Sequence, residues 1–216
     1  MHASIAASAI LVFARAPVPG AAKTRLIPRL GEWGAARLQA RLTARALRTA
    51  RATGMHVELY AAPNGNHPFF RHVARTEQIR IERQRGEDLG ERMRGAFERA
   101  LRRHRFVVLI GTDCPALVAR DLRRAVRLLQ GSCDAVIAPA EDGGYGLIAL
   151  RRVRAGIFQG IEWGGDSVLL ETLSTMKALN FTCKLLRTVW DVDRPEDLQR
   201  LRSLRFSSDR PRAARR

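Results

Sequence analysis

Short apolar runs alternate with longer amphipathic segments along most of the chain. Apolar runs bounded by polar residues, glycine or proline predict buried strands, and apolar residues spaced three or four apart predict helices. The strands are expected over 8–14, 56–62, 79–82, 107–111, 135–138, 146–150 and 184–189, and the helices over 34–53, 89–104, 118–130, 167–179 and 195–204. This alternation predicts an α/β fold with a mostly parallel sheet covered by helices on both faces.

The chain reads as one domain. Its 216 residues contain no internal repeat and no linker, so we expect a domain over 1–206 and a basic tail over 207–216. The apolar stretch 5–13 loosely resembles a signal peptide, but only His2 precedes it with any charge, so a first strand is the favoured interpretation. No apolar run reaches the roughly 18 residues that a membrane span requires.

Composition adds a strong positive charge, formally +17. Such a charge permits a nucleic-acid-binding module, which remains an alternative of a different class. However, most arginines are scattered over expected helices, aromatic residues are scarce, and no nucleic-acid-binding motif accompanies the charge. The three cysteines form no C-x-x-C pair and the five histidines show no metal-ligand spacing, so we expect a reduced, cytoplasmic protein without a zinc site.

The loop after the first strand carries the first candidate chemistry. Prolines and a glycine fix its course, and basic residues flank it, which suits a polyphosphate. The loop lacks the G-x-x-x-x-G-K pattern of a Walker A motif, and a proline-rich connector with solvated basic residues is an equal alternative. The candidate phosphate-binding residues are Arg15, Gly20, Lys23, Thr24 and Arg25, on a loop expected to be exposed and polar.

Two aspartates follow expected strands and form the candidate metal site. Asp113 follows the strand at 107–111, and Asp193 follows the last strand. Ligands of such sheets lie at the carboxyl ends of the strands, where carboxylates hold divalent cations. Asp113 has an alternative role in an Asx turn before Pro115, and Asp193 has the spacing of a capping box with Glu196.

Two further segments contain candidate residues. In the turn at 141–146, Glu141 or Asp142 would act as a general base on an acceptor hydroxyl, unless the segment is only a tight connection. The segment 84–93 enters a helix, where Gln84 and Asp88 would line a nucleotide pocket or serve only as the helix start.

In order, the motifs FARAPVPGAAKTRL, QRGEDLGERM, LIGTDCPAL, APAEDGGYGLIAL, IFQGIEW and DVDRPEDL resemble a known family. It is the family of bacterial arsenosugar-biosynthesis-type glycosyltransferases, within the nucleotide-diphospho-sugar transferase (GT-A) superfamily. The resemblance covers about 10–201. It implies a GT-A Rossmann-like three-layer sandwich, a nucleotide-sugar donor, a small-molecule acceptor and a Mg or Mn ion.

Residue by residue, the resemblance implies phosphate binding by Lys23 and Arg25 and metal binding by Asp113 and Asp193. The segment that faces the acceptor or sugar comprises Asp142, Gly143, Gly144 and Tyr145, with Trp163 on the same side. Gly146 and Gly165 depart from the family pattern, in which a bulky residue and a threonine are more common.

These expectations combine into glycosyl transfer. Asp113 and Asp193 are expected to lie close enough to share one ion, while Glu141 or Asp142 deprotonates the acceptor. The alternative is a nucleotidyltransferase resembling 2-phospholactate guanylyltransferase, which would use a nucleoside triphosphate and a phosphorylated acceptor.

Overall fold

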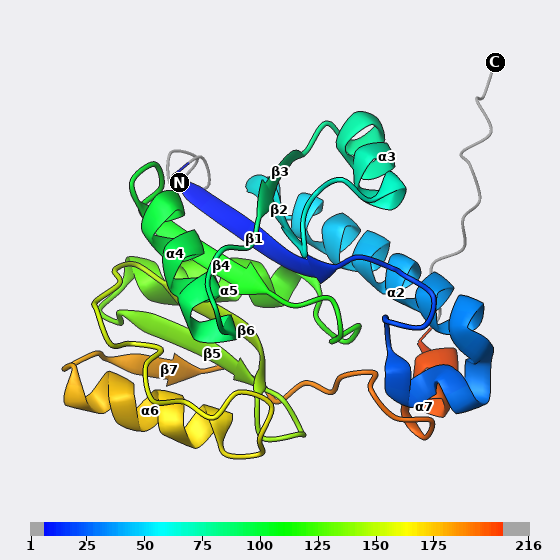
Figure 1. Cartoon of the computed structure of the whole chain (residues 1–216). Coiled ribbons are helices and arrows are strands. Elements are labelled where there is room, and N and C mark those ends of the chain that lie inside the picture. Colours follow the sequence, from blue (N-terminus) through cyan, green and yellow to red (C-terminus); the bar gives the residue numbers. More distant parts are fainter. Residues whose placement is uncertain (1–6, 205–216) are drawn as a thin grey trace.

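A computed structural model describes residues 7–204, which form an α/β fold around one seven-stranded sheet (Figure 1). The strand order is β3-β2-β1-β4-β6-β5-β7, and β6 alone runs antiparallel to its neighbours. The strands are β1 (Ser8–Arg15), β2 (His56–Ala62), β3 (Arg80–Arg83), β4 (Phe106–Ile110), β5 (Ala135–Pro139), β6 (Tyr145–Leu150) and β7 (Cys183–Leu185). The expected mostly parallel sheet is confirmed; the tail expected over 207–216 lies outside the described residues.

Helices cover both faces of the sheet, which gives three layers (Figure 1). One core cluster joins the sheet to α2, α3 and α5, and a second joins its other face to α4 and α6. The helices are η1 (Thr24–Leu26), α2 (Ile27–Arg51), α3 (Pro68–Glu77), α4 (Leu89–Leu101), α5 (Ala119–Gln130), α6 (Val168–Ala178) and α7 (Asp197–Ser203). None of the helices within 7–204 is long and apolar enough to cross a bilayer.

The three main differences from the expected elements concern α3, β7 and the start of α2. Helix α3 was not expected, because its apolar residues are few and follow the turn-forming sequence Asn64-Gly65-Asn66. Strand β7 is only three residues long, and the chain beyond it returns to the sheet through one bridge between Ala140 and Val189. Helix α2 begins earlier than expected, with a kink at Gly31, where φ is 67°.

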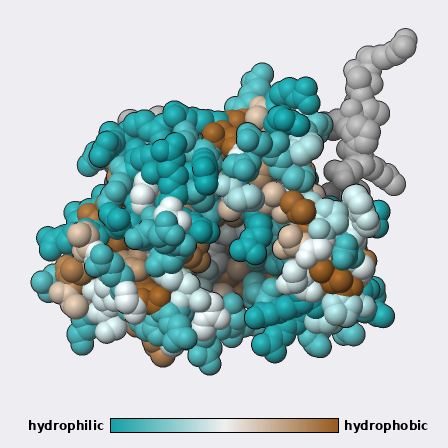
Figure 2. Space-filling view, in the orientation of Figure 1, coloured by the Kyte–Doolittle hydropathy of each residue, from teal (hydrophilic) through white to brown (hydrophobic). Residues whose placement is uncertain are grey.

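The end of the described chain packs against its beginning. Leu26 of η1 and Leu38 and Leu42 of α2 form a small core with Val192 and Leu201. This contact brings the segment after β7 beside the loop after β1, at the edge of the sheet where the parallel strands end (Figure 1). Figure 2 shows a recess on this face, between the lobe of α7 and the body of the sheet.

Candidate active site

A cavity of about 550 Å³ lies at the carboxyl ends of β1 and β4. We call it the carboxylate pocket, because Asp113 and Asp193 both line it. The structure thus brings together seven of the residues expected to bind phosphate or metal: Arg15, Lys23, Thr24, Arg25, Gln84, Asp113 and Asp193. Gln39 and Arg92 also line this pocket and were not expected from the sequence.

Lys23 is not the exposed cation that the loop sequence suggested. Its side chain is only 4% exposed, and its ammonium donates to the Val192 carbonyl oxygen at 2.6 Å and contacts Asp113 Oδ1 at 2.9 Å. A buried ammonium is tolerated only with such partners. These partners come from segments far away in the sequence, which explains why the loop alone gave the wrong prediction.

Arg25 is exposed, as expected, and forms an ion pair with Asp193. The expected capping box of Asp193 with Glu196 is wrong, because Glu196 makes no side-chain cap for α7. Instead, Asp197 Oδ2 accepts hydrogen bonds from the backbone amides of Asp193 (3.0 Å) and Arg194 (2.7 Å). The Asp193 carboxylate is therefore free of a capping role and faces the loop after β1.

A backbone hydrogen bond joins the two segments that carry Asp113 and Asp193. The Val192 amide donates to the Asp113 carbonyl oxygen at 2.8 Å, and Lys23 contacts both segments. The Asp113 side chain is half exposed and that of Asp193 is about a third exposed. Two carboxylates are thus presented to one cavity, each beside one basic side chain.

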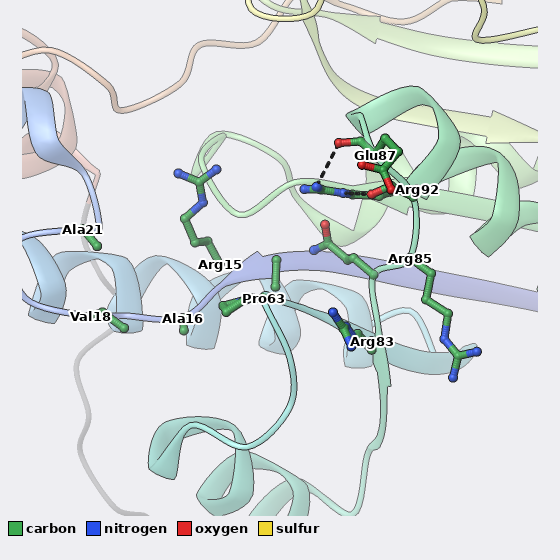
Figure 3. A pocket seen from close by; sticks show the side chains of 12 residues that line it. Arg15, Ala16, Val18, Ala21, Pro63, Arg83, Arg85, Glu87 and Arg92 are labelled. Carbon is green, nitrogen blue, oxygen red and sulfur yellow. Dashed lines mark hydrogen bonds between the residues drawn. The ribbon is translucent and has the colours of Figure 1, made fainter.

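A second cavity, of about 630 Å³, adjoins the first. Four arginines and one acidic residue, Glu87, line it, so we call it the arginine pocket. Figure 3 shows Arg15 at the end of β1, with the other arginines arriving from β3, the following loop and α4: Arg83, Arg85 and Arg92. The two pockets share Arg15, Ala21, Ala62, Gln84 and Arg92 and so lie side by side, and we call the two together the cleft.

Of three further expected nucleotide-binding residues, two have hydrogen-bond partners within the protein and the third lies outside both pockets. Gln84 Nε2 donates to the Tyr60 carbonyl oxygen at 2.8 Å, which fixes its side chain between the pockets. Asp88 caps α4, since its Oδ1 accepts from the Glu91 amide at 2.7 Å. Gly20 adopts a φ of 78° in the loop after β1 and lines neither pocket.

The turn between β5 and β6 carries two carboxylates, Glu141 and Asp142, which have different hydrogen-bond partners. Glu141 forms a double ion pair with Arg200 (2.6 and 3.0 Å), and this contact lowers the pKa of the Glu141 carboxyl group. Asp142 Oδ1 accepts from the Gly144 amide at 3.0 Å. Burial, followed by the nearby charge of Asp142, raises the pKa of Asp191 to about 6. The sequence did not indicate Asp191, because its raised pKa depends on burial and on Asp142, which is distant in the sequence.

Glycines allow this turn to pack closely. At Gly143, where φ is 87°, an added Cβ would lie 1.9 Å from the Asp166 carbonyl oxygen. At Gly146, an added Cβ would lie 2.6 Å from Cys114 Sγ. A larger side chain at Gly146 would therefore collide with Cys114 in this chain.

Tyr145 and Trp163 pack at the edge of the core beneath α4 and α6. The Tyr145 hydroxyl is buried, and burial raises its pKa. The Trp163 ring contacts Phe158 and lies against Gly90 of α4, where an added Cβ would be 2.9 Å from the ring. Neither residue lines the two pockets, so the structure separates them from the phosphate and metal candidates.

Three solved structures show what the fold is similar to. A Desulfovibrio desulfuricans G20 protein with the provisional name nucleotide-diphospho-sugar transferase is 33% identical, with 94% of this chain and 90% of that chain covered and a TM-score of 0.85. CMP:2-keto-3-deoxy-manno-octonic acid synthetase complexed with CTP is 14% identical, covering 91% and 97%, with a TM-score of 0.58. Rv0371c of Mycobacterium tuberculosis H37Rv in complex with manganese is 19% identical, covering 91% and 98%, with a TM-score of 0.56.

The last two similarities concern the fold alone, and they agree with the Rossmann-like α/β architecture that the sequence predicted. No curated protein matches the chain. Residues 43–165 match the family described as "Uncharacterized protein conserved in bacteria (DUF2064)", and the chain belongs to that family.

Proposed function

We propose that the protein is a transferase that binds a nucleotide, with the nucleotide's phosphates lying across the carboxylate and arginine pockets. One observation carries this proposal: Arg15 and Arg92 line both pockets, so one cleft offers carboxylates for a cation beside guanidinium groups for an anion. Guanidinium groups suit phosphate oxygens because they donate paired, charge-assisted hydrogen bonds.

In this proposal Asp113 and Asp193 hold a Mg or Mn ion, since hard divalent cations prefer carboxylate oxygens. Both carboxylates are partly exposed in the same pocket, which fits a bound cation. The ion would offset the negative charge of a diphosphate leaving group. Arg25, which is mostly exposed, would turn from Asp193 to the phosphates, whereas buried Lys23 would stay and orient Asp113.

The acceptor would approach from the turn between β5 and β6. Asp142 is the better candidate for the general base. Arg200 forms an ion pair with Glu141, whereas the Asp142 carboxylate accepts a hydrogen bond from the Gly144 amide. Asp191 would take up a proton as the pH falls through about 6, since burial and the charge of Asp142 raise its pKa to about that value. Gly143, Gly144, Tyr145 and Trp163 would then shape this acceptor side rather than the phosphate side.

Within this class we favour glycosyl transfer from a nucleotide-diphospho-sugar. Its support is the arsenosugar-type motif order together with the provisional name of the D. desulfuricans protein, which is 33% identical over nearly the whole chain. Nucleotidyl transfer is the second candidate. The observation that favours it is the excess of positive charge in the arginine pocket, four arginines against Glu87, which suits a triphosphate.

Calorimetric titration distinguishes the candidates. Nucleoside diphosphates, nucleotide sugars and triphosphates would each be titrated with Mn and with EDTA. Tight Mn-dependent binding of nucleotide sugars supports glycosyl transfer, and a preference for triphosphates supports nucleotidyl transfer. Asp113→Asn should abolish the Mn dependence, while Glu77→Gln on α3 makes the same charge change away from the cleft. Unchanged Mn dependence in Asp113→Asn would contradict the metal site, and steeply salt-dependent DNA or RNA binding without nucleotide binding would favour the nucleic-acid alternative.

A further inference from the structure

A second group of ligand-type side chains lies at the opposite end of the sheet from the cleft. His56 begins β2, Glu58 follows it on the same face of that strand, and His104 lies between α4 and β4. One ligand atom of each of the three residues lies within 4.8 Å of the other two. His56 Nε2 is 3.2 Å from Glu58 Oε1, and the two imidazole rings are stacked with centroids 5.1 Å apart.

The polar groups of this cluster are only partly satisfied by the protein. Glu58 is fully buried, and its carboxylate contacts His56, Tyr60 and Arg103. Among residues 7–204, His104 Nδ1 is buried with no hydrogen-bond partner. A buried nitrogen without a partner is costly, and such atoms in native structures call for a ligand or another explanation.

We propose that His56, Glu58 and His104 form a zinc site. Two imidazole nitrogens and one carboxylate oxygen are a ligand set that zinc favours, and a water molecule would complete a four-coordinate site. Mg and Mn prefer all-oxygen ligands, so this site would differ in metal from the Asp113–Asp193 pair. The His56 side chain is 46% exposed, which gives an ion a path to the buried carboxylate.

Zinc binding requires two local changes, one in the ligand side chains and one at Arg103. Tetrahedral ligands at about 2.0–2.1 Å from zinc are roughly 3.3 Å apart. His56 Nε2 and Glu58 Oε1 already lie 3.2 Å apart, and the His104 nitrogen, within 4.8 Å of both, would need only a small shift to reach this spacing. Arg103 contacts Glu58 at 2.8 Å and competes with the ion for this carboxylate. The Arg103 side chain is partly exposed, so it can turn to solvent when the ion binds.

The bound ion would tie the end of α4 to β2. Helix α4 has Leu89 and Arg92 of the carboxylate pocket near its other end, and Tyr60 of β2 packs against its buried face. The ion therefore has a structural role in this proposal: it stabilises the layer that positions Arg92 without touching the substrate.

The test is a titration of untagged, chelator-treated protein with Zn²⁺, followed by calorimetry and melting temperature, and with Co²⁺, followed by visible absorption. The wild type should bind one equivalent in this cluster, melt at higher temperature with zinc, and give a Co²⁺ spectrum of nitrogen and oxygen ligands. His56→Ala and His104→Ala should each weaken Zn²⁺ binding at least tenfold. Arg103→Gln should tighten it, because the competing cation is removed.

Matched controls separate this site from the others. His72→Ala removes an exposed histidine of α3, and Asp113→Asn removes the cleft carboxylate; both should leave the Co²⁺ spectrum unchanged. Because His56 is nearly half exposed, its alanine variant should stay folded, which circular dichroism checks. Wild-type affinity in the folded His56→Ala or His104→Ala variant, a thiolate Co²⁺ spectrum, or no Zn²⁺ binding at micromolar concentration would overturn the proposal.

Discussion

The two halves of the sheet differ in how the loops at their ends are held. Strands β3, β2, β1 and β4 are all parallel, and the loops after β1 and β4 present charged side chains with solvent-exposed surface, such as Arg25 and Asp113. The half with β6, β5 and β7 contains the antiparallel strand and a tight turn fixed by backbone packing at Gly143. Charge pairs can exchange partners when a ligand binds, whereas a packed turn holds its side chains in place. The first half therefore suits variable phosphate and metal contacts, and the second suits a fixed acceptor side.

The largest expected effect separates the two halves by kinetics. Asp142→Asn should slow transfer by about 10²–10⁴-fold while leaving nucleotide affinity unchanged, because it removes a general base outside the phosphate pockets. Asp113→Asn should lose Mn-dependent nucleotide binding and turnover together. Single-turnover assays with nucleotide titrations measure both.

Glu141→Gln is the matched control with a smaller expected effect, since Arg200 already forms an ion pair with that carboxylate. Equal loss of nucleotide affinity in Asp142→Asn and Asp113→Asn would merge the two sides into one donor site.

Packing of the acceptor side should appear as a difference between neighbouring glycines. Gly143→Ala should lower the free energy of unfolding by roughly 3 kcal/mol, because a Cβ at this left-handed position meets the Asp166 backbone at 1.9 Å. Gly144→Ala should cost much less, since its nearest contact is the Asp142 side chain at 3.3 Å and its φ is not positive. Urea unfolding of both variants decides this, and similar losses would show that the turn is not held by that contact.

The same contrast explains what the sequence could predict. Local patterns predicted β2 over its full observed range and placed Asp113 and the turn at 141–146 at one edge of the sheet. Both conclusions depend on periodicity and on the geometry of parallel strands. The short helix α3 was not predicted, because its apolar face is small and the sequence before it favours a turn.

The contacts that decide the site lie outside any local pattern. Lys23 meets Val192 and Arg25 meets Asp193 across almost the whole chain, and Arg200 reaches back to Glu141. Such pairs depend on the three-dimensional path of the chain, which places η1 and α7 together through Leu26 and Leu201. For the same reason the sequence did not indicate Asp191 or the His56–Glu58–His104 cluster.

A smaller effect tests whether two basic side chains of the loop after β1, Arg25 and Lys23, differ in role. Arg25→Ala should weaken nucleotide binding about tenfold or more, equivalent to about 1.5–3 kcal/mol, with little change in melting temperature, because the side chain is exposed. Lys23→Ala should also lower the melting temperature, since it leaves Asp113 and the Val192 carbonyl without their buried partner. Calorimetry and thermal melting of both variants measure the split. A melting temperature that falls equally in both would show that Arg25 has a structural role as well.

The smallest effect concerns the second half at the end away from the cleft, where Asp134 joins its three strands. Its carboxylate accepts two hydrogen bonds at 2.9 Å from Arg152, which follows β6, and further bonds from Thr182, which precedes β7. The Arg152 contact lowers the pKa of Asp134 from 3.8 to about 2. Because the folded value is below the unfolded one, this stabilisation is complete above about pH 5, where both states are ionised. It is lost as the pH falls from about 5 towards 2, because the unfolded state takes up its proton first.

The loss should be on the order of 2 kcal/mol, and Asp134→Asn should lack this part of the acid-induced loss. Urea unfolding at a series of pH values measures it, with Glu77→Gln on α3 as the control for removing a carboxylate elsewhere. If the free energy of unfolding of the wild type and of Asp134→Asn falls in parallel below pH 5, the charged Asp134 carboxylate does not stabilise this end of the sheet through Arg152 and Thr182.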